Sequence, residues 1–116
     1  MVVLLHGWEG SSESLYILSL GQALWERGFE VVRLNLRDHG DSHYLNPEIF
    51  HSCRIREVVG AVQRLQQLEP AQAVNLVGFS LGGNFCLRVG ARAAEAGLRL
   101  EQVVAVCPVI DPEHTL

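Results

Sequence analysis

The chain has 116 residues, of which 48% are hydrophobic and 19% are charged, so it carries enough apolar side chains to bury a core. That length allows one domain at most, and the composition excludes a disordered segment, a collagen-like repeat and a coiled coil. The net charge of −4, without any cluster of basic residues, argues against nucleic acid as a partner.

Four short apolar runs predict β-strands at residues 2–5, 30–36, 73–77 and 100–107. In the longer stretches between them, apolar residues recur every three or four positions, as Ile17, Leu20 and Leu24 do. These stretches predict three helices. Gly28 and Pro70 stand where the first two helices should end, and Asn46-Pro47-Glu48 resembles the start of the second one. The predicted order is β-α-β-α-β-α-β.

Strands this apolar are buried on both faces, which predicts an α/β fold: a parallel sheet with helices on each face. The commonest topology has the spatial order 2-1-3-4, with the first helix alone on one face and the other two together on the opposite face. Ligands bind beyond the carboxyl ends of such strands, where His6-Gly7 and Ser80 emerge side by side. The last strand would then form an exposed apolar edge, so we expect residues 1–116 to be one partial domain.

The segment Gly78-Phe79-Ser80-Leu81-Gly82-Gly83 lies between the third strand and the third helix, the context of a nucleophile elbow. Gly78 and Gly82 permit a tight, strained turn that leaves the Ser80 hydroxyl free, and the amide of Leu81 lies at the positive end of the new helix. A dinucleotide-binding loop would need glycine at position 80, and a phosphate-binding P-loop would need lysine after its last glycine. Neither is present.

Leu5-His6-Gly7-Trp8-Glu9-Gly10 follows the first strand, and its glycines suit a loop that turns a backbone N–H toward an oxyanion. The expected donor is the amide of Trp8, which would complement that of Leu81. His6 and Gly7 are expected to support this loop, His6 through hydrogen bonds and not as a base. The Trp8 side chain is either a pocket wall or ordinary packing.

Arg37-Asp38-His39-Gly40-Asp41-Ser42 forms a polar loop after the second strand. Arg37 and Asp41 are expected to form a structural ion pair or to stabilise turns. His39 and His43 stay open as alternatives for a catalytic base.

In this order and spacing, the three motifs resemble the α/β-hydrolase superfamily. Within it, the continuation Glu9-Gly10-Ser11, His51-Ser52 and Gly82-Gly83-Asn84 resemble the bacterial YheT-like hydrolases, akin to the ABHD-type esterases and lipases. The resemblance spans nearly the whole chain. It implies Ser80 as nucleophile, the amides of Trp8 and Leu81 as oxyanion hole, and hydrolysis of small-molecule esters through an acyl-enzyme. Asp38 departs from the pattern, since the superfamily commonly has glycine after the arginine.

The superfamily order is serine, acid, histidine, with the last two after later strands. Asp111 is a candidate acid, although Asp111-Pro112 also suits a turn cap, and His114 is expected to be an exposed tail residue. The sequence therefore predicts an incomplete α/β-hydrolase fold that carries the nucleophile half. We expect the N-terminal strands and the acid- and histidine-bearing part to be absent, and this piece to be inactive without a base.

Two other classes stay open: an α/β-hydrolase-like domain that binds a small molecule without reacting, and a complete four-stranded binding or signalling module. Neither a cofactor nor a metal is implied, because the five histidines form no recognisable ligand pair. The apolar runs are too short to span a membrane, and no targeting signal is visible, so we expect a cytoplasmic location. Reduced, buried thiols are accordingly expected at Cys53, Cys86 and Cys107. The oligomeric state stays open.

Overall fold

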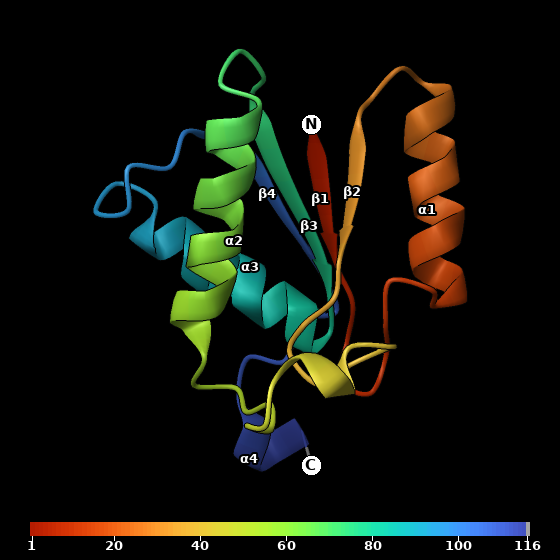
Figure 1. Ribbon diagram of the computed structural model, residues 1–116, viewed down its shortest axis with the longest axis vertical. Coiled ribbons are helices and arrows are strands. Elements are labelled where there is room, and N and C mark those ends of the chain that lie inside the picture. The colour runs from red at the N-terminus through yellow and green to blue at the C-terminus, as the bar shows by residue number, and fades with distance from the viewer. Residues whose placement is uncertain (116) are drawn as a thin grey trace.

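The computed structural model describes residues 1–115, and its main elements follow the predicted order (Figure 1). The strands are β1 (Val2–Leu5), β2 (Val31–Leu34), β3 (Val74–Phe79) and β4 (Leu100–Val106). The long helices are α1 (Leu15–Glu26), α2 (Ile55–Leu68) and α3 (Leu81–Arg92). A 3₁₀ turn at His43–Leu45 and the short helix α4 (Pro112–Thr115) complete the described elements.

The four strands form one parallel sheet in the order β2-β1-β3-β4, which confirms the predicted topology. β1 lies in the middle, with Leu5 opposite Leu34 on one side and Gly78 on the other. Because parallel strands end at the same edge, this register brings the loops after β1, β2 and β3 together. The site is therefore expected at that edge.

The two faces of the sheet carry different numbers of helices, as predicted: α1 covers one face, and α2 and α3 cover the other (Figure 1). Side chains of β1 alternate between two cores. Val2 and Leu4 pack with Ile17 of α1, whereas Val3 and Leu5 belong to the larger core under α2 and α3. Every position of β1 is buried, which explains its unbroken apolar sequence.

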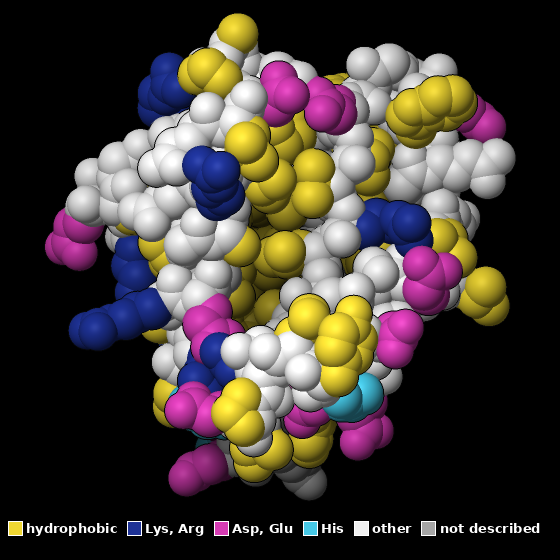
Figure 2. Space-filling view, viewed as in Figure 1, with side chains coloured by type: hydrophobic (Ala, Val, Ile, Leu, Met, Phe, Trp, Pro, Cys, Tyr) yellow, Lys and Arg dark blue, Asp and Glu magenta, His cyan; other side chains and the backbone are white. Residues whose placement is uncertain are grey.

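The outer strand β4 has an exposed apolar side, which confirms the expected edge. Val103 and Ala105 approach Gly90 and Gly83 of α3. The alternate residue Val104 is 44% exposed on the other face. Figure 2 shows a second apolar region, in a hollow between α2 and the strands. The helices therefore cover the sheet incompletely in residues 1–115.

The start of α2 differs from the sequence-based expectation. The helix begins at Ile55 and not near Asn46-Pro47-Glu48, and residues 46–54 form a loop. The Arg54 guanidinium holds this loop, because it donates to the carboxylate of Glu48 at 2.8 Å and to the carbonyl of Ile49 at 3.0 Å. These side-chain contacts outweigh the local capping signal.

The lengths of two strands and the burial of two cysteines also differ from the sequence-based expectation. β2 is shorter than predicted, and β3 runs on to Phe79. Cys86 is buried, and burial raises the pKa of its thiol to about 12. Cys53 and Cys107 are exposed instead, because one lies in the loop before α2 and the other directly after the edge strand β4. No helix in residues 1–115 is long and apolar enough to cross a bilayer.

Candidate active site

Ser80 connects β3 to α3 in a conformation that serine rarely adopts, with φ 53° and ψ −115°. Backbone hydrogen bonds hold it there. Its N–H donates to the carbonyl of Val106 at 3.0 Å, and its carbonyl accepts from the N–H groups of Asn84 (3.1 Å) and Val109 (3.2 Å). The strained, exposed turn predicted from the sequence is confirmed.

Gly78 and Gly82 are required because backbone atoms lie where a side chain would begin. A Cβ on Gly78 would lie 2.2 Å from the carbonyl oxygen of Gly82. A Cβ on Gly82 would lie 2.4 Å from the carbonyl oxygens of both Leu5 and His6. The first glycine therefore lets α3 fold back over the end of β3, and the second lets α3 contact β1.

The loop after β1 makes a tight turn directly beside Ser80. The N–H of Gly10 donates to the carbonyl of Gly7 at 3.0 Å, and Glu9 has a φ of 59°. A Cβ on Gly7 would lie 3.4 Å from the Cβ of Ser80. No hydrogen bond from the amide of Trp8 or Leu81 to another part of residues 1–115 is present. Trp8 is 61% exposed, so its side chain is a cavity wall and not core packing.

His6 joins two of the loops at this edge. Its Nε2 accepts a hydrogen bond from the N–H of Leu36 at 3.1 Å, and its Nδ1 lies 2.6 Å from the carbonyl oxygen of Gly7. The proton is therefore on Nδ1 and the ring is neutral. Burial lowers the pKa of His6, the neighbouring His39 acts in the same direction, and the bond to Gly7 opposes them. This geometry supports the structural role expected for His6.

Ser80 opens onto an apolar cavity of about 400 Å³. Its lining comes from four loops or element ends: Trp8, Phe50, His51, Ser52, Ser80, Leu81, Val109, Pro112 and Thr115. Phe50, His51 and Ser52 belong to the loop before α2. Their position at the site was not predicted from the sequence, although His51-Ser52 was part of the family resemblance. His51 is the histidine that lines this cavity within the described residues.

The polar loop after β2 is arranged differently from the expectation. Arg37 pairs with Glu57 of α2, with Nε 2.8 Å from Oε1, and not with Asp41. Arg54 shares that carboxylate at 3.2 Å. Hydrogen bonding from Arg37 is the main reason that the pKa of Glu57 is lowered. The loop is thus tied to the first turn of α2.

Neither candidate base of this loop lines the Ser80 cavity. His39 is buried with its Nδ1 2.8 Å from the carbonyl oxygen of Arg37, and the Nδ1 of the exposed His43 contacts the carboxylate of Asp38. Asp38 has a φ of 59°, a conformation that Asp tolerates better than most residues. That explains how it stands where the superfamily commonly has glycine.

Asp111 was expected to be either the catalytic acid or a turn cap, and in the structure it caps α4. Its Oδ1 accepts from the N–H of Glu113 at 3.1 Å, and its Oδ2 lies 2.7 Å from Nδ1 of His114. His114 is exposed, as expected. Asp111 and His114 form a pair beside the Ser80 cavity but do not line it. The described residues contain no cluster of three or more metal-ligating side chains.

The strain at Ser80 predicts that two variants that both lack the hydroxyl, Ser80→Gly and Ser80→Ala, differ in folding stability. Ser80→Gly should be more stable than Ser80→Ala by about 1 kcal/mol, because glycine adopts this conformation without strain. Glycine also loses more backbone entropy on folding than alanine, but this cost offsets only part of the relieved strain. Urea unfolding followed by circular dichroism measures the difference. Equal stability, or a more stable alanine variant, would show that the turn is not strained.

A serine at a strained strand-to-helix turn of a parallel sheet defines an α/β domain of the nucleophile-elbow class. The chain belongs to the alpha/beta hydrolase fold family, whose model matches residues 1–116. Similar solved structures include Est1E from Butyrivibrio proteoclasticus (TM-score 0.79, 18% identity, 93% of this chain and 42% of that one). Another is XC6422 from Xanthomonas campestris, an α/β serine hydrolase without a lid (TM-score 0.74, 22% identity, 96% and 50%).

A third similar structure is an α/β serine hydrolase homologue from Coxiella burnetii, with a TM-score of 0.73, 18% identity and coverage of 99% of this chain and 54% of that one. Among curated proteins, a 4-hydroxy-3-methylbut-2-enyl diphosphate reductase of Desulfotalea psychrophila is 30% identical over 93 residues, 78% of this chain and 29% of that protein. The chain thus spans about half the length of the solved structures and under a third of the curated relative. The structural likenesses show the fold.

Proposed function

We propose that this chain carries the nucleophile of a serine hydrolase that cleaves carboxylic esters through an acyl-enzyme. The observation that carries the proposal is the strained Ser80 turn, which presents the hydroxyl at the mouth of an apolar cavity. Ser80 Oγ attacks the ester carbonyl and transfers its proton to a base, and the alcohol leaves as the acyl-enzyme forms. Water then releases the acid and restores the serine.

The amides of Trp8 and Leu81 are proposed to stabilise the tetrahedral oxyanion. Leu81 is the first residue of α3, so the partial positive charge at this end of the helix strengthens its N–H as a donor to an anion. Trp8 follows Gly7, the glycine that packs beside Ser80. The base and its acid are proposed to come from residues outside 1–116, in the superfamily order of serine, acid and histidine. Without them, this piece is proposed to be inactive.

The apolar lining supports an ester with an apolar acyl or aryl part as the substrate. The structure of Est1E with bound ferulic acid offers a precedent for an aromatic acid in a similar fold. We also propose membership of the YheT-like, ABHD-type branch. His51-Ser52 lines the cavity, and Asn84 Nδ2 donates to the carbonyl of Val109 at 2.8 Å, so two of the motifs behind that resemblance lie at the site.

Labelling with a fluorophosphonate probe tests the proposal, because the probe reacts with an activated serine and not with an ordinary hydroxyl. We expect labelling of the longer natural protein that contains this sequence, little or none of residues 1–116, and none in Ser80→Ala. Ser52→Ala is the matched control, since it removes another hydroxyl from the same cavity and should keep full labelling. Intact-protein mass measures the adduct.

One observation favours the alternative of a binding domain that does not react: no histidine within residues 1–115 hydrogen-bonds to the Ser80 hydroxyl. If the longer protein is folded and stays unlabelled at Ser80, the enzyme proposal falls and the binding domain replaces it. Labelling that persists in Ser80→Ala would also overturn the role given to this serine.

A further inference from the structure

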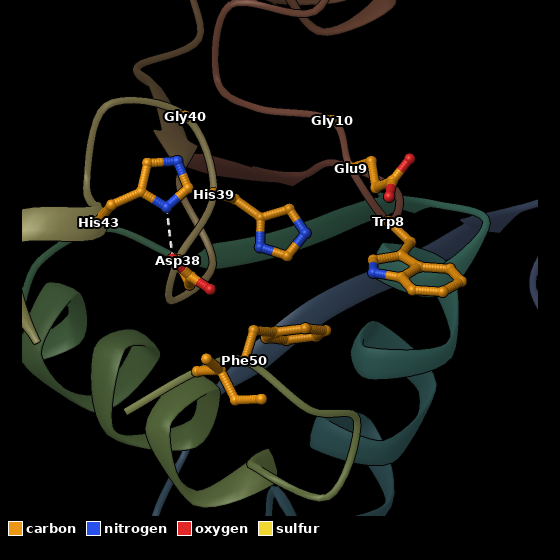
Figure 3. Close-up of a pocket in the computed structure, with 9 residues that line it drawn as sticks. Trp8, Glu9, Gly10, Asp38, His39, Gly40, His43 and Phe50 are labelled. Carbon is orange, nitrogen blue, oxygen red and sulfur yellow. Dashed lines mark hydrogen bonds and ion pairs between the residues drawn. The ribbon is translucent and has the colours of Figure 1, made fainter. Parts of the chain in front are cut away.

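A second cavity, of about 420 Å³, adjoins the one at Ser80. The two share the side chains of Trp8 and Phe50 as walls, so these aromatic rings separate them. Apart from Ile49, which comes from the loop before α2, the rest of the second cavity is lined by residues of the loop after β1 and of the segment that runs from β2 to the 3₁₀ turn, most of them polar (Figure 3). A ligand bound next to Ser80 therefore has a second, chemically different space within reach.

His39 presents an unused hydrogen-bond acceptor to this cavity. The residue is 6% exposed, and its Nδ1 carries the proton because it lies 2.8 Å from the carbonyl oxygen of Arg37. Nε2 is therefore an acceptor, and no hydrogen bond to it from the rest of residues 1–115 is present. Figure 3 shows the ring projecting toward Trp8, with Nε2 on that side. No buried side-chain nitrogen or oxygen of the described residues lacks a hydrogen-bond partner, so this Nε2 is open to the cavity, where it can accept a hydrogen bond from a ligand that donates.

The cavity is also suited to positive charge. Glu9 lies on its rim and makes no ion pair within the described chain, and the carboxylate of Asp38 contacts only the imidazole of His43. No Lys or Arg of residues 1–115 lines it, and the neighbouring Arg37 is paired with Glu57. Trp8 and Phe50 also line it, and aromatic rings attract cations.

We propose that this second cavity binds a protonated amine, a primary or secondary ammonium group carried by the alcohol part of the ester. Its N–H donates to Nε2 of His39, and its charge lies between Glu9 and the ring of Trp8. The acyl part then occupies the apolar cavity with the ester carbonyl at Ser80, and the alcohol part extends past Trp8 and Phe50 into the second cavity. The assignment to the alcohol part rests on the proposed ester hydrolysis, whereas amine binding itself does not.

Binding is measured in the folded Ser80→Ala variant, by following the indole N–H resonance of Trp8 while benzylammonium is added. The indole of Trp25, exposed on α1 far from the cavity, serves as an internal reference. We expect Trp8 to shift and Trp25 not to. Affinity should fall about threefold or more in Glu9→Gln, as for the loss of one partly screened charge. It should be unchanged in Glu69→Gln, which removes a carboxylate beyond the far end of α2.

Two matched ligands separate the contributions. Benzyl alcohol lacks the charge, and benzyltrimethylammonium keeps the charge but lacks the N–H donor, so both should bind several-fold more weakly. Equal binding of either ligand, or an unshifted Trp8, would overturn the proposal. Amine binding is measured in the Ser80→Ala variant, which performs no chemistry, so the two proposals can fail separately. If the labelling experiment fails and the amine still binds, the proposed enzyme activity is wrong and the proposed amine site stands.

Discussion

Replacing Gly82 by alanine is expected to lower the free energy of unfolding by about 3 kcal/mol or more, at the upper end for overpacked sites. The added methyl group would lie 2.4 Å from two carbonyl oxygens at the end of β1, well inside van der Waals contact. Backbone in a central strand moves less readily than a side chain. Helix α3 would have to move away from β1, and the Ser80 turn would move with it.

Gly60→Ala is the matched control, because Gly60 also lies inside a helix and has nothing within 4 Å of its would-be Cβ. That substitution should raise the free energy of unfolding by up to about 1 kcal/mol, the helix-propensity difference. Urea unfolding followed by far-UV circular dichroism compares both variants with the unmodified chain. A Gly82→Ala variant as stable as the unmodified chain would contradict the close approach of α3 to β1.

His6→Leu is expected to cost about 3 kcal/mol of folding stability, because two buried backbone groups each lose a partner. The N–H of Leu36 would lose its acceptor, and the carbonyl of Gly7 would lose one of its two donors and keep only the N–H of Gly10. Leucine fills similar space, so the loss reflects the hydrogen bonds more than the packing. The same change at the exposed His114 should alter stability by less than about 0.5 kcal/mol.

The state of His6 also predicts how stability depends on pH. Its pKa is lowered in the folded protein, so the unfolded chain takes up a proton near pH 6.5 while the folded ring is still neutral. Stability from this residue is fully present above about pH 6.5 and is lost as the pH falls toward the folded pKa. Unfolding midpoints measured from neutral to acidic pH should decline more steeply in the unmodified chain than in His6→Leu. Parallel declines would mean that another group dominates.

Much of the fold follows from local patterns. The β1 residues are apolar at every position because both faces of that strand are covered, and this is the pattern of a central parallel strand. Gly78 and Gly82 mark the turn at Ser80 because their positions admit no side chain. The strand order and the meeting of three loops at one edge then follow from the handedness of the crossovers.

The remaining features depend on contacts between distant residues, which local patterns do not carry. Arg37 reaches Glu57 across twenty positions, although Asp41 is closer in sequence. The loop before α2 takes its shape partly from Arg88, whose guanidinium donates to the carbonyl of Ser52 at 2.6 Å. That bond joins residues 36 positions apart and fixes a loop that lines the Ser80 cavity, so the place of His51 at the cavity could not be predicted from local patterns.

The central place of β1 has a consequence for how the chain folds. Val2 pairs with Val31 on one side and with Asn75 on the other, so β1 acquires its second neighbour only after β2, α2 and β3 have been synthesised. Closing so long a loop before any sheet contact compensates for it makes folding slow. A nascent chain therefore presents a wholly apolar strand with one unpaired edge until β3 is made, a form that aggregates readily and that chaperones bind.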